Sequence, residues 1–188
     1  MQKELSSAIR KIRQWIKQSK VLDVVIFGSS ARGKPKPTDV DLCIILTDAD
    51  EKRSLDIIDS LGKLADKEGM NAHISVLTSS AIISGNTLAK TLLAEGVSIK
   101  NDDCFSMAFG FKSRSLFSYT LKHFTPAQRV QFHYALKGRY GSQGALAETK
   151  GTFLGTGNIL VPVENEDLLK EIFDKWNVKY KVDRILIG

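Results

Sequence analysis

The stretch GSSARG at residues 28–33, followed after five residues by DVDL at residues 39–42, decides how this chain folds. Apolar, β-branched runs lie on both sides of the loop, at residues 21–27 and 40–46. Runs of this length and composition predict two buried strands. Because a loop rather than a helix joins the strands, we expect them to pair antiparallel.

The elements around these strands predict the rest of the first unit. Apolar residues at helical spacing predict amphipathic helices over residues 4–19 and 51–68, and the run 72–77 predicts a third strand. A further helical segment, interrupted near Gly85, ends near residue 95. The third strand returns after a helical crossover. The expected fold class is therefore α+β, with a small mixed β-sheet packed by helices over residues 1–104.

A second unit is expected over residues 105–188. The sequence TPAQ at residues 125–128 combines a capping threonine, a proline at the first helical position and a glutamine three residues after the cap. It predicts a helix that reaches residue 137. Strands near 159–163 and 178–187, with a helix between them, complete a small basic α+β domain.

The positive charge of the chain is concentrated in this second unit. Residues 105–150 contain seven lysines and arginines against Glu148 alone, a net charge of +6 that equals the net charge of the whole chain. Such a segment favours an anionic partner, RNA or DNA, and its interleaved aromatic residues suit base stacking. The alternatives are a merely solvated basic surface and, for aromatic and apolar positions such as Phe132 and Leu136, a place in the core.

The turn after the first strand has the features of a phosphate site. Gly28 permits a tight turn and a close approach of a ligand. The hydroxyls of Ser29 and Ser30 can donate to phosphate oxygens, and the guanidinium of Arg32 offers a fork that suits phosphate. Lys34 adds positive charge nearby. The Gly-Lys-Ser/Thr ending of a P-loop is absent from this motif.

The two acids that follow suit a divalent cation. Asp39 and Asp41 are two residues apart at the start of a strand, so both side chains point to one face of the sheet. Two carboxylates on one face repel each other unless a cation lies between them. Mg²⁺, or Mn²⁺ in its place, binds such carboxylates together with substrate phosphates. For an isolated pair of this kind, a solvated turn is the ordinary alternative.

Together, the turn and the acid pair resemble the nucleotidyltransferase signature of the DNA polymerase β superfamily, and most of all its minimal nucleotidyltransferases. The resemblance covers about residues 5–100 and includes LLAEGV at residues 92–97. It implies that Gly28 and Ser29 contact a nucleoside triphosphate, with ATP as the expected nucleotide. It further implies that Asp39 and Asp41 bind the divalent ions. A third carboxylate on a later strand completes the site in that family.

The chain departs from the family pattern at this third carboxylate. The corresponding strand, residues 71–77, contains no acid, and His73 and Ser75 are the residues whose parity could face the site. A neutral His73 is a candidate base or metal ligand, or simply a structural strand residue. The departure puts catalysis in doubt more than nucleotide binding.

The motifs favour an enzyme that transfers a nucleoside monophosphate from a metal-bound triphosphate to an acceptor hydroxyl. One alternative is a nucleotidyltransferase fold that has lost its chemistry and binds nucleic acid or protein. Another is the antitoxin of a toxin–antitoxin pair, against which the extra C-terminal unit argues. No stretch has the roughly 18 apolar residues of a membrane span, so a cytoplasmic protein is expected.

Overall fold

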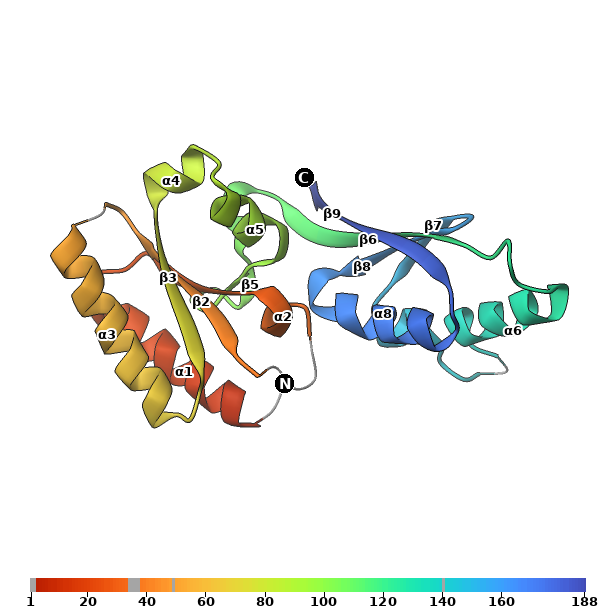
Figure 1. Cartoon of the computed structure of the whole chain (residues 1–188), viewed down its shortest axis with the longest axis horizontal. Coiled ribbons are helices and arrows are strands. Elements are labelled where there is room, and N and C mark those ends of the chain that lie inside the picture. Colours follow the sequence, from red (N-terminus) through yellow and green to blue (C-terminus); the bar gives the residue numbers. More distant parts are fainter. Residues whose placement is uncertain (1–2, 34–37, 49, 140) are drawn as a thin grey trace.

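The computed structural model describes residues 3–33, 38–48, 50–139 and 141–188, and it contains two α+β units side by side (Figure 1). The first unit is built on a five-stranded sheet with the strand order β3-β2-β1-β4-β5. Its strands are β1 (Asp23–Phe27), β2 (Val40–Leu46), β3 (Ala72–Thr78), β4 (Val97–Ser98) and β5 (Asp103–Cys104). The α+β fold class is thus confirmed.

Strand pairing in the first sheet confirms the expected topology. β1 and β2 pair antiparallel, with Phe27 opposite Asp41, while β2 and β3 pair parallel. The parallel pair is joined by the crossover helix α3 (Glu51–Lys67), which follows β2 in the chain and packs against β3. β4 then adds to the free edge of β1. The sheet is therefore mixed, as the order of elements predicted.

Helices cover both faces of this sheet. Helix α1 (Lys3–Gln18) and α3 pack on one face, where they bury alternate residues of β2 such as Leu42 and Ile44. The short helix α4 (Ser79–Ile83) and helix α5 (Thr87–Glu95) contribute to the core on the other face, around Cys43. Asp39 and Asp41 have the parity of Cys43, so they point to the face that carries α5.

The second unit is an antiparallel sheet with the order β7-β8-β6-β9. Its strands are β6 (Lys112–Thr120), β7 (Thr152–Gly155), β8 (Asn158–Pro162) and β9 (Lys179–Ile187). Its helices are α6 (Pro126–Lys137), α7 (Ala145–Glu148) and α8 (Glu166–Lys175), and two 3-10 turns, η1 (Phe105–Phe109) and η2 (Val163–Asn165), precede β6 and α8. Helix α6 lies at the end of the molecule farthest from the first sheet (Figure 1).

The core of the second unit is aromatic. Phe117, Phe132 and Phe173 are fully buried and make edge-to-face contacts with ring centroids 5.5 to 5.6 Å apart. Leu136, one turn after Phe132 on α6, is also buried. The core interpretation of Phe132 and Leu136 is therefore confirmed. Among the described aromatic residues of 105–150, Phe105 and Phe124 are also buried, whereas Phe109, Phe111 and Tyr134 are exposed.

Strand β6 was not predicted from the sequence, and its burial pattern explains why. Ser113 and Ser115 are the buried residues at its start, with 1% and 0% of their surface exposed. Buried serines give no apolar periodicity, so the strand has no clear alternation of apolar and polar residues.

The start of α6 follows the prediction. The Thr125 side chain accepts from the backbone N–H of Gln128, and the Gln128 side chain accepts from the N–H of Thr125. This reciprocal pair places the helix start at Pro126. Separately, none of the helices in the described ranges is both long and apolar enough to cross a bilayer.

Candidate functional site

The first glycine of the motif lies against the second acid. Gly28 follows β1 directly and has a φ of +69°, a conformation that L side chains rarely adopt. A Cβ atom added at Gly28 would lie 2.4 Å from Oδ2 of Asp41, which faces it across the antiparallel pair of strands. Only glycine allows the turn to approach the carboxylate this closely.

Three side chains lie close together where the loop after β1 enters β2. Asp39 and Asp41 lie on one face at the start of β2, and the parallel register of β3 places His73 beside Asp41. The His73 Nδ1 atom is 3.3 Å from Oδ2 of Asp39 and 3.7 Å from Oδ1 of Asp41. We call Asp39, Asp41 and His73 the carboxylate–histidine triad. Its side chains are 36%, 32% and 67% exposed, so a ligand can reach them.

The donor set of the triad suits a divalent cation. One potential ligand atom from each residue lies within 4.8 Å of the other two. Carboxylate oxygens bind hard divalent cations, and imidazole nitrogens bind first-row transition metals. His73 thus faces the same side of the sheet as the two acids, as its position in the third strand predicted.

The serines of the motif lie on the turn between Gly28 and the acids. Residues Gly28–Ala31 form the single-turn helix α2, and both serines are half-buried. The Ser30 hydroxyl donates to the backbone carbonyl of Asp39 at 3.2 Å, which ties the turn to the start of β2. Ser29 lies one residue nearer to Gly28. Lys34 falls outside the residues that the structure describes.

The model of the polymerase beta nucleotidyltransferase family matches residues 10–104, just over half of the chain. The chain belongs to this family. A search of the curated proteins found no match. Among solved structures, a chain from a tri-AMPylated Shewanella oneidensis HEPN toxin in complex with MNT antitoxin is similar, at 16% identity and a TM-score of 0.37. The similarity covers 69% of this chain and 91% of that one.

Within the nucleotidyltransferase domain, the Arg32 side chain is paired with a carboxylate. Its Nη1 atom donates to both carboxylate oxygens of Glu95, at 3.1 and 3.0 Å. The same Glu95 accepts from the backbone N–H of Gly28 at 2.9 Å. Glu95, at the end of α5, therefore contacts both ends of the turn at residues 28–33, which we call the motif turn. The role of Arg32 in binding phosphate stays a prediction.

The second unit supplies further partners of this arginine. Arg32 Nε lies 3.6 Å from Oδ2 of Asp167 and 3.9 Å from Oε1 of Glu166, both at the start of α8. The backbone carbonyl of Arg32 also accepts from the N–H of Asp167 at 3.4 Å. A Cβ added at Gly33 would lie 2.0 Å from the carbonyl oxygen of Glu164. The motif turn thus packs directly on the second unit.

Arg184 of β9 joins the two buried acids. Its Nη1 atom is 2.6 Å from Oε2 of Glu95, and its Nε and Nη2 atoms donate to the two oxygens of Glu166 at 2.9 Å each. Lys170 completes the arrangement with contacts to Glu166 and Asp167. We call these residues the interdomain charge cluster; its members are Arg32, Glu95, Glu166, Asp167, Lys170 and Arg184. Its three acids and three bases balance in charge.

Glu166 is the most enclosed member of the cluster, with none of its surface exposed. Burial alone would raise the pKa of its carboxyl, but hydrogen bonds from Arg184, Lys170 and Ser115 outweigh burial and lower that pKa to about 2. The hydroxyl of Ser115, on β6, donates at 2.6 Å. Glu166 is thus a charged, fully partnered group.

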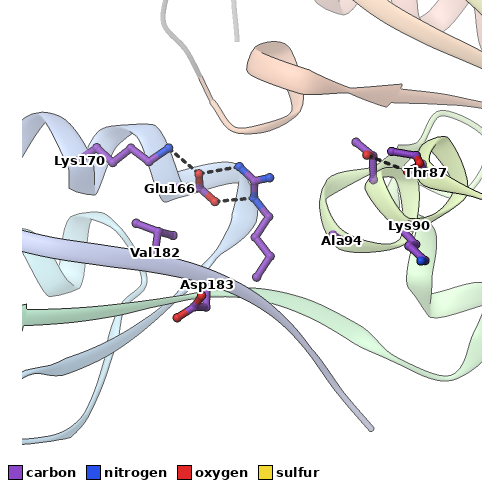
Figure 2. A pocket seen from close by; sticks show the side chains of 9 residues that line it. Thr87, Lys90, Ala94, Glu166, Lys170, Val182 and Asp183 are labelled. Carbon is purple, nitrogen blue, oxygen red and sulfur yellow. Dashed lines mark hydrogen bonds and ion pairs between the residues drawn. The ribbon is translucent and has the colours of Figure 1, made fainter.

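A pocket of about 490 Å³ lies next to this cluster, between α5 and the second unit. Figure 2 shows Glu166 and Lys170 on one side of it and Thr87 and Lys90 of α5 on the other. Because Lys170 and Arg184 are paired with Glu166, the pocket wall has no strong excess of positive charge.

No local sequence pattern indicates most of this cluster. The segment LLAEGV, which contains Glu95, resembles the end of the family's domain but does not indicate an ion pair with Arg32. Glu166, Lys170 and Arg184 are ordinary charged residues of a helix and a strand in sequence terms. Only the contact of the two units brings them to the motif turn.

Proposed function

We propose that the chain transfers a nucleoside monophosphate from a nucleoside triphosphate, with ATP as the expected nucleotide, to an acceptor hydroxyl, in the presence of a divalent cation. The observation that supports this most strongly is the convergence of Asp39, Asp41 and His73 beside Gly28. A cation site next to a turn with a close backbone approach is the arrangement that a metal–triphosphate substrate needs.

In this proposal, Asp39 and Asp41 hold the divalent cation and the turn from Gly28 to Ser30 holds the phosphates. When bound, the cation would neutralise the charge that develops on the phosphate oxygens. Asp41 lies at the junction of the two functions, because its Oδ2 faces Gly28 and its Oδ1 faces His73. A change in the orientation of this one carboxylate would therefore affect both the cation site and the phosphate turn.

The reaction proposed is a single displacement. The acceptor oxygen forms a bond to the α-phosphorus, and the bond from that phosphorus to the bridging oxygen of the pyrophosphate breaks. Pyrophosphate leaves with the electron pair, and the proton of the acceptor hydroxyl passes to water. Positioning of the two reactants supplies a large part of the rate enhancement in phosphoryl and nucleotidyl transfer.

We propose further that the acceptor is a nucleic acid, RNA or DNA, held by residues 105–150. Six of the seven basic side chains of this segment are exposed, and only Arg114 is half-buried. Those on and around α6 lie at the far end of the molecule from the triad (Figure 1). An acceptor that contacts both regions must therefore be an extended polyanion, and its binding should weaken steeply with salt.

Label transfer from an α-labelled nucleotide tests the proposal. The wild-type chain is incubated with α-labelled ATP, RNA or DNA oligonucleotides and Mg²⁺ or Mn²⁺, and transfer is followed on a gel. Asp39→Asn and Asp41→Asn should abolish transfer. The control Asp59→Asn removes an exposed acid of α3 that pairs with Lys63, and it should transfer normally. Wild-type chain that labels no acceptor with either metal would refute the proposal.

A binding module is the second candidate, and one observation favours it: β3, the strand expected from the family resemblance to carry a third carboxylate, contains no acid. A module of this kind predicts salt-sensitive binding to a polyanion that is unchanged in Asp39→Asn, with no label transfer. The same preparations decide between the two candidates. The antitoxin alternative stays a prediction, and mixing with a separately expressed toxin chain would be needed to test it.

A further inference from the structure

We infer that His73 is a direct metal ligand, and that it changes the preference of the site from Mg²⁺ to divalent first-row transition metals such as Mn²⁺. The inference rests on the proposed function, because it names the metal class of the same site. The Nδ1 atom of His73 lies within 3.7 Å of an oxygen of each of the two acids.

The spacing of these atoms matches ligands that share one cation. Ligands at about 2.1 Å from a six-coordinate ion lie about 3.0 Å apart when adjacent and about 4.2 Å apart when opposite. The His73 Nδ1 atom is 3.3 Å from Asp39 Oδ2 and 3.7 Å from Asp41 Oδ1, between these two values. The full set lies within 4.8 Å, so a small contraction of exposed side chains closes it around an ion.

Strand register, rather than a flexible loop, sets this position. His73 lies opposite Asp41 in the parallel β2–β3 pair, and both belong to strands that are hydrogen-bonded along their full length. The residues that flank the site in β2, Val40 and Leu42, are buried. The backbone that carries Asp41 and His73 is therefore preorganised, whereas Asp39 lies in the bend just before β2.

The chemistry of the donors decides the class of metal. Mg²⁺ takes oxygen ligands almost exclusively and gives up its bound waters reluctantly. An imidazole nitrogen is a good ligand for transition metals, which also accept carboxylate oxygens. Replacing the oxygen ligand of the third position by nitrogen therefore weakens Mg²⁺ binding more than Mn²⁺ binding.

The Nδ1 atom of His73 faces the two acids that would hold the cation. Direct ligation by His73 would therefore use Nδ1.

Pulsed electron paramagnetic resonance on Mn²⁺-loaded protein tests the inference without any activity measurement. A directly bound imidazole gives ¹⁴N modulation of the Mn²⁺ echo. We expect this modulation in the wild-type chain and in the control His133→Ala, which removes an exposed histidine of α6. We expect it to be lost in His73→Asp, which restores an all-oxygen triad. Because the His73 side chain is 67% exposed, this variant should fold normally, and circular dichroism checks that.

Competition between the metals gives the second measurement. The Mg²⁺ concentration that displaces half of the Mn²⁺ should be about tenfold lower in His73→Asp than in the wild-type chain, since an oxygen ligand favours Mg²⁺. Binding of Mn²⁺ without ¹⁴N modulation would overturn the role of His73 but leave the proposed transfer intact. Modulation without label transfer would uphold the ligand and refute the transfer. Absence of Mn²⁺ binding would overturn the inference.

Discussion

The carboxylate–histidine triad and the interdomain charge cluster both contain acidic and basic side chains, but they differ in how exposed and how fully paired the acids are. The triad leaves at least 32% of each side chain exposed, with the two acids facing one histidine. In the cluster, the Glu95 and Glu166 side chains are 4% and 1% exposed, and each contacts at least two basic residues. Acids with open coordination positions can exchange ligands, whereas acids that are buried and fully paired can only hold other groups in place.

The two regions are joined through Glu95. This carboxylate accepts from the N–H of Gly28, and Gly28 in turn lies against Asp41. Substitutions in the charge cluster should therefore lower the free energy of unfolding. Substitutions at Gly28, where the turn meets Asp41, should change metal binding and transfer at the triad.

The largest effect is expected for Glu166→Gln. The change leaves Arg184 and Lys170 without their shared buried partner, which typically costs about 3–5 kcal/mol of unfolding free energy. Urea unfolding at neutral pH measures it. Glu171→Gln, an exposed position on the same helix, is the control and should change stability by less than about 0.5 kcal/mol. A loss of less than about 1 kcal/mol in Glu166→Gln would mean that the cluster is not a stabilising element.

Acid should reproduce part of this loss in the wild-type chain. The pKa of Glu166 is lowered in the folded state to about 2 from an ordinary 4.5, so its contribution is complete above pH 4.5 and disappears as the pH falls toward 2. This shift corresponds to about 3 kcal/mol. Denaturant midpoints of the wild-type chain and Glu166→Gln, measured from pH 7 down to pH 3, should converge. A difference that stays constant would contradict the assignment.

Gly28→Ala should displace Asp41 of the triad, because the turn at Gly28 lies against this carboxylate. An alanine at a φ of +69° costs about 1–2 kcal/mol, and its Cβ would displace the Asp41 carboxylate. A shift of about 1 Å in a site of this kind can lower the rate about 100-fold. Gly69→Ala is a matched control, because Gly69 has a φ of +66° and nothing within 4 Å of the added Cβ.

Equal stability losses are expected for the two glycine variants, with a loss of Mn²⁺ affinity and label transfer only in Gly28→Ala. Titration of Mn²⁺ by electron paramagnetic resonance makes the comparison. If both variants bound the metal like the wild-type chain, the close approach of Gly28 to Asp41 would have no functional role.

The smallest effect is expected for Ser30→Ala. The variant loses the hydrogen bond to the Asp39 carbonyl, which contributes about 0.5–1.5 kcal/mol in proteins. Ser84→Ala removes a similar hydroxyl–carbonyl bond, to Ala81 in α4, and serves as the control. Thermal unfolding should show similar small shifts for both, while label transfer should fall only in Ser30→Ala. Unchanged transfer would exclude Ser30 from phosphate binding.

Local patterns predicted most of the elements of this fold. β2 (Val40–Leu46) is apolar from Leu42 onward because both of its faces are buried there, and α6 begins at a capping box that is present in the sequence. β6 escaped prediction because its buried positions include serines, whose hydroxyls give no apolar signal. β6 supports the charge cluster, because the hydroxyl of Ser115 donates to the carboxylate of Glu166.

The sequence by itself determined the ligands of the proposed site. Asp39 and Asp41 share a face because of their two-residue spacing, and His73 shares it because of its parity in the next strand, so short-range geometry suffices. Only the tertiary structure decided the surroundings of Arg32, since Glu95 and Arg184 are 63 and 152 residues away in the chain. Burial and ion pairing between such distant residues depend on how the two units pack, and no local pattern encodes that.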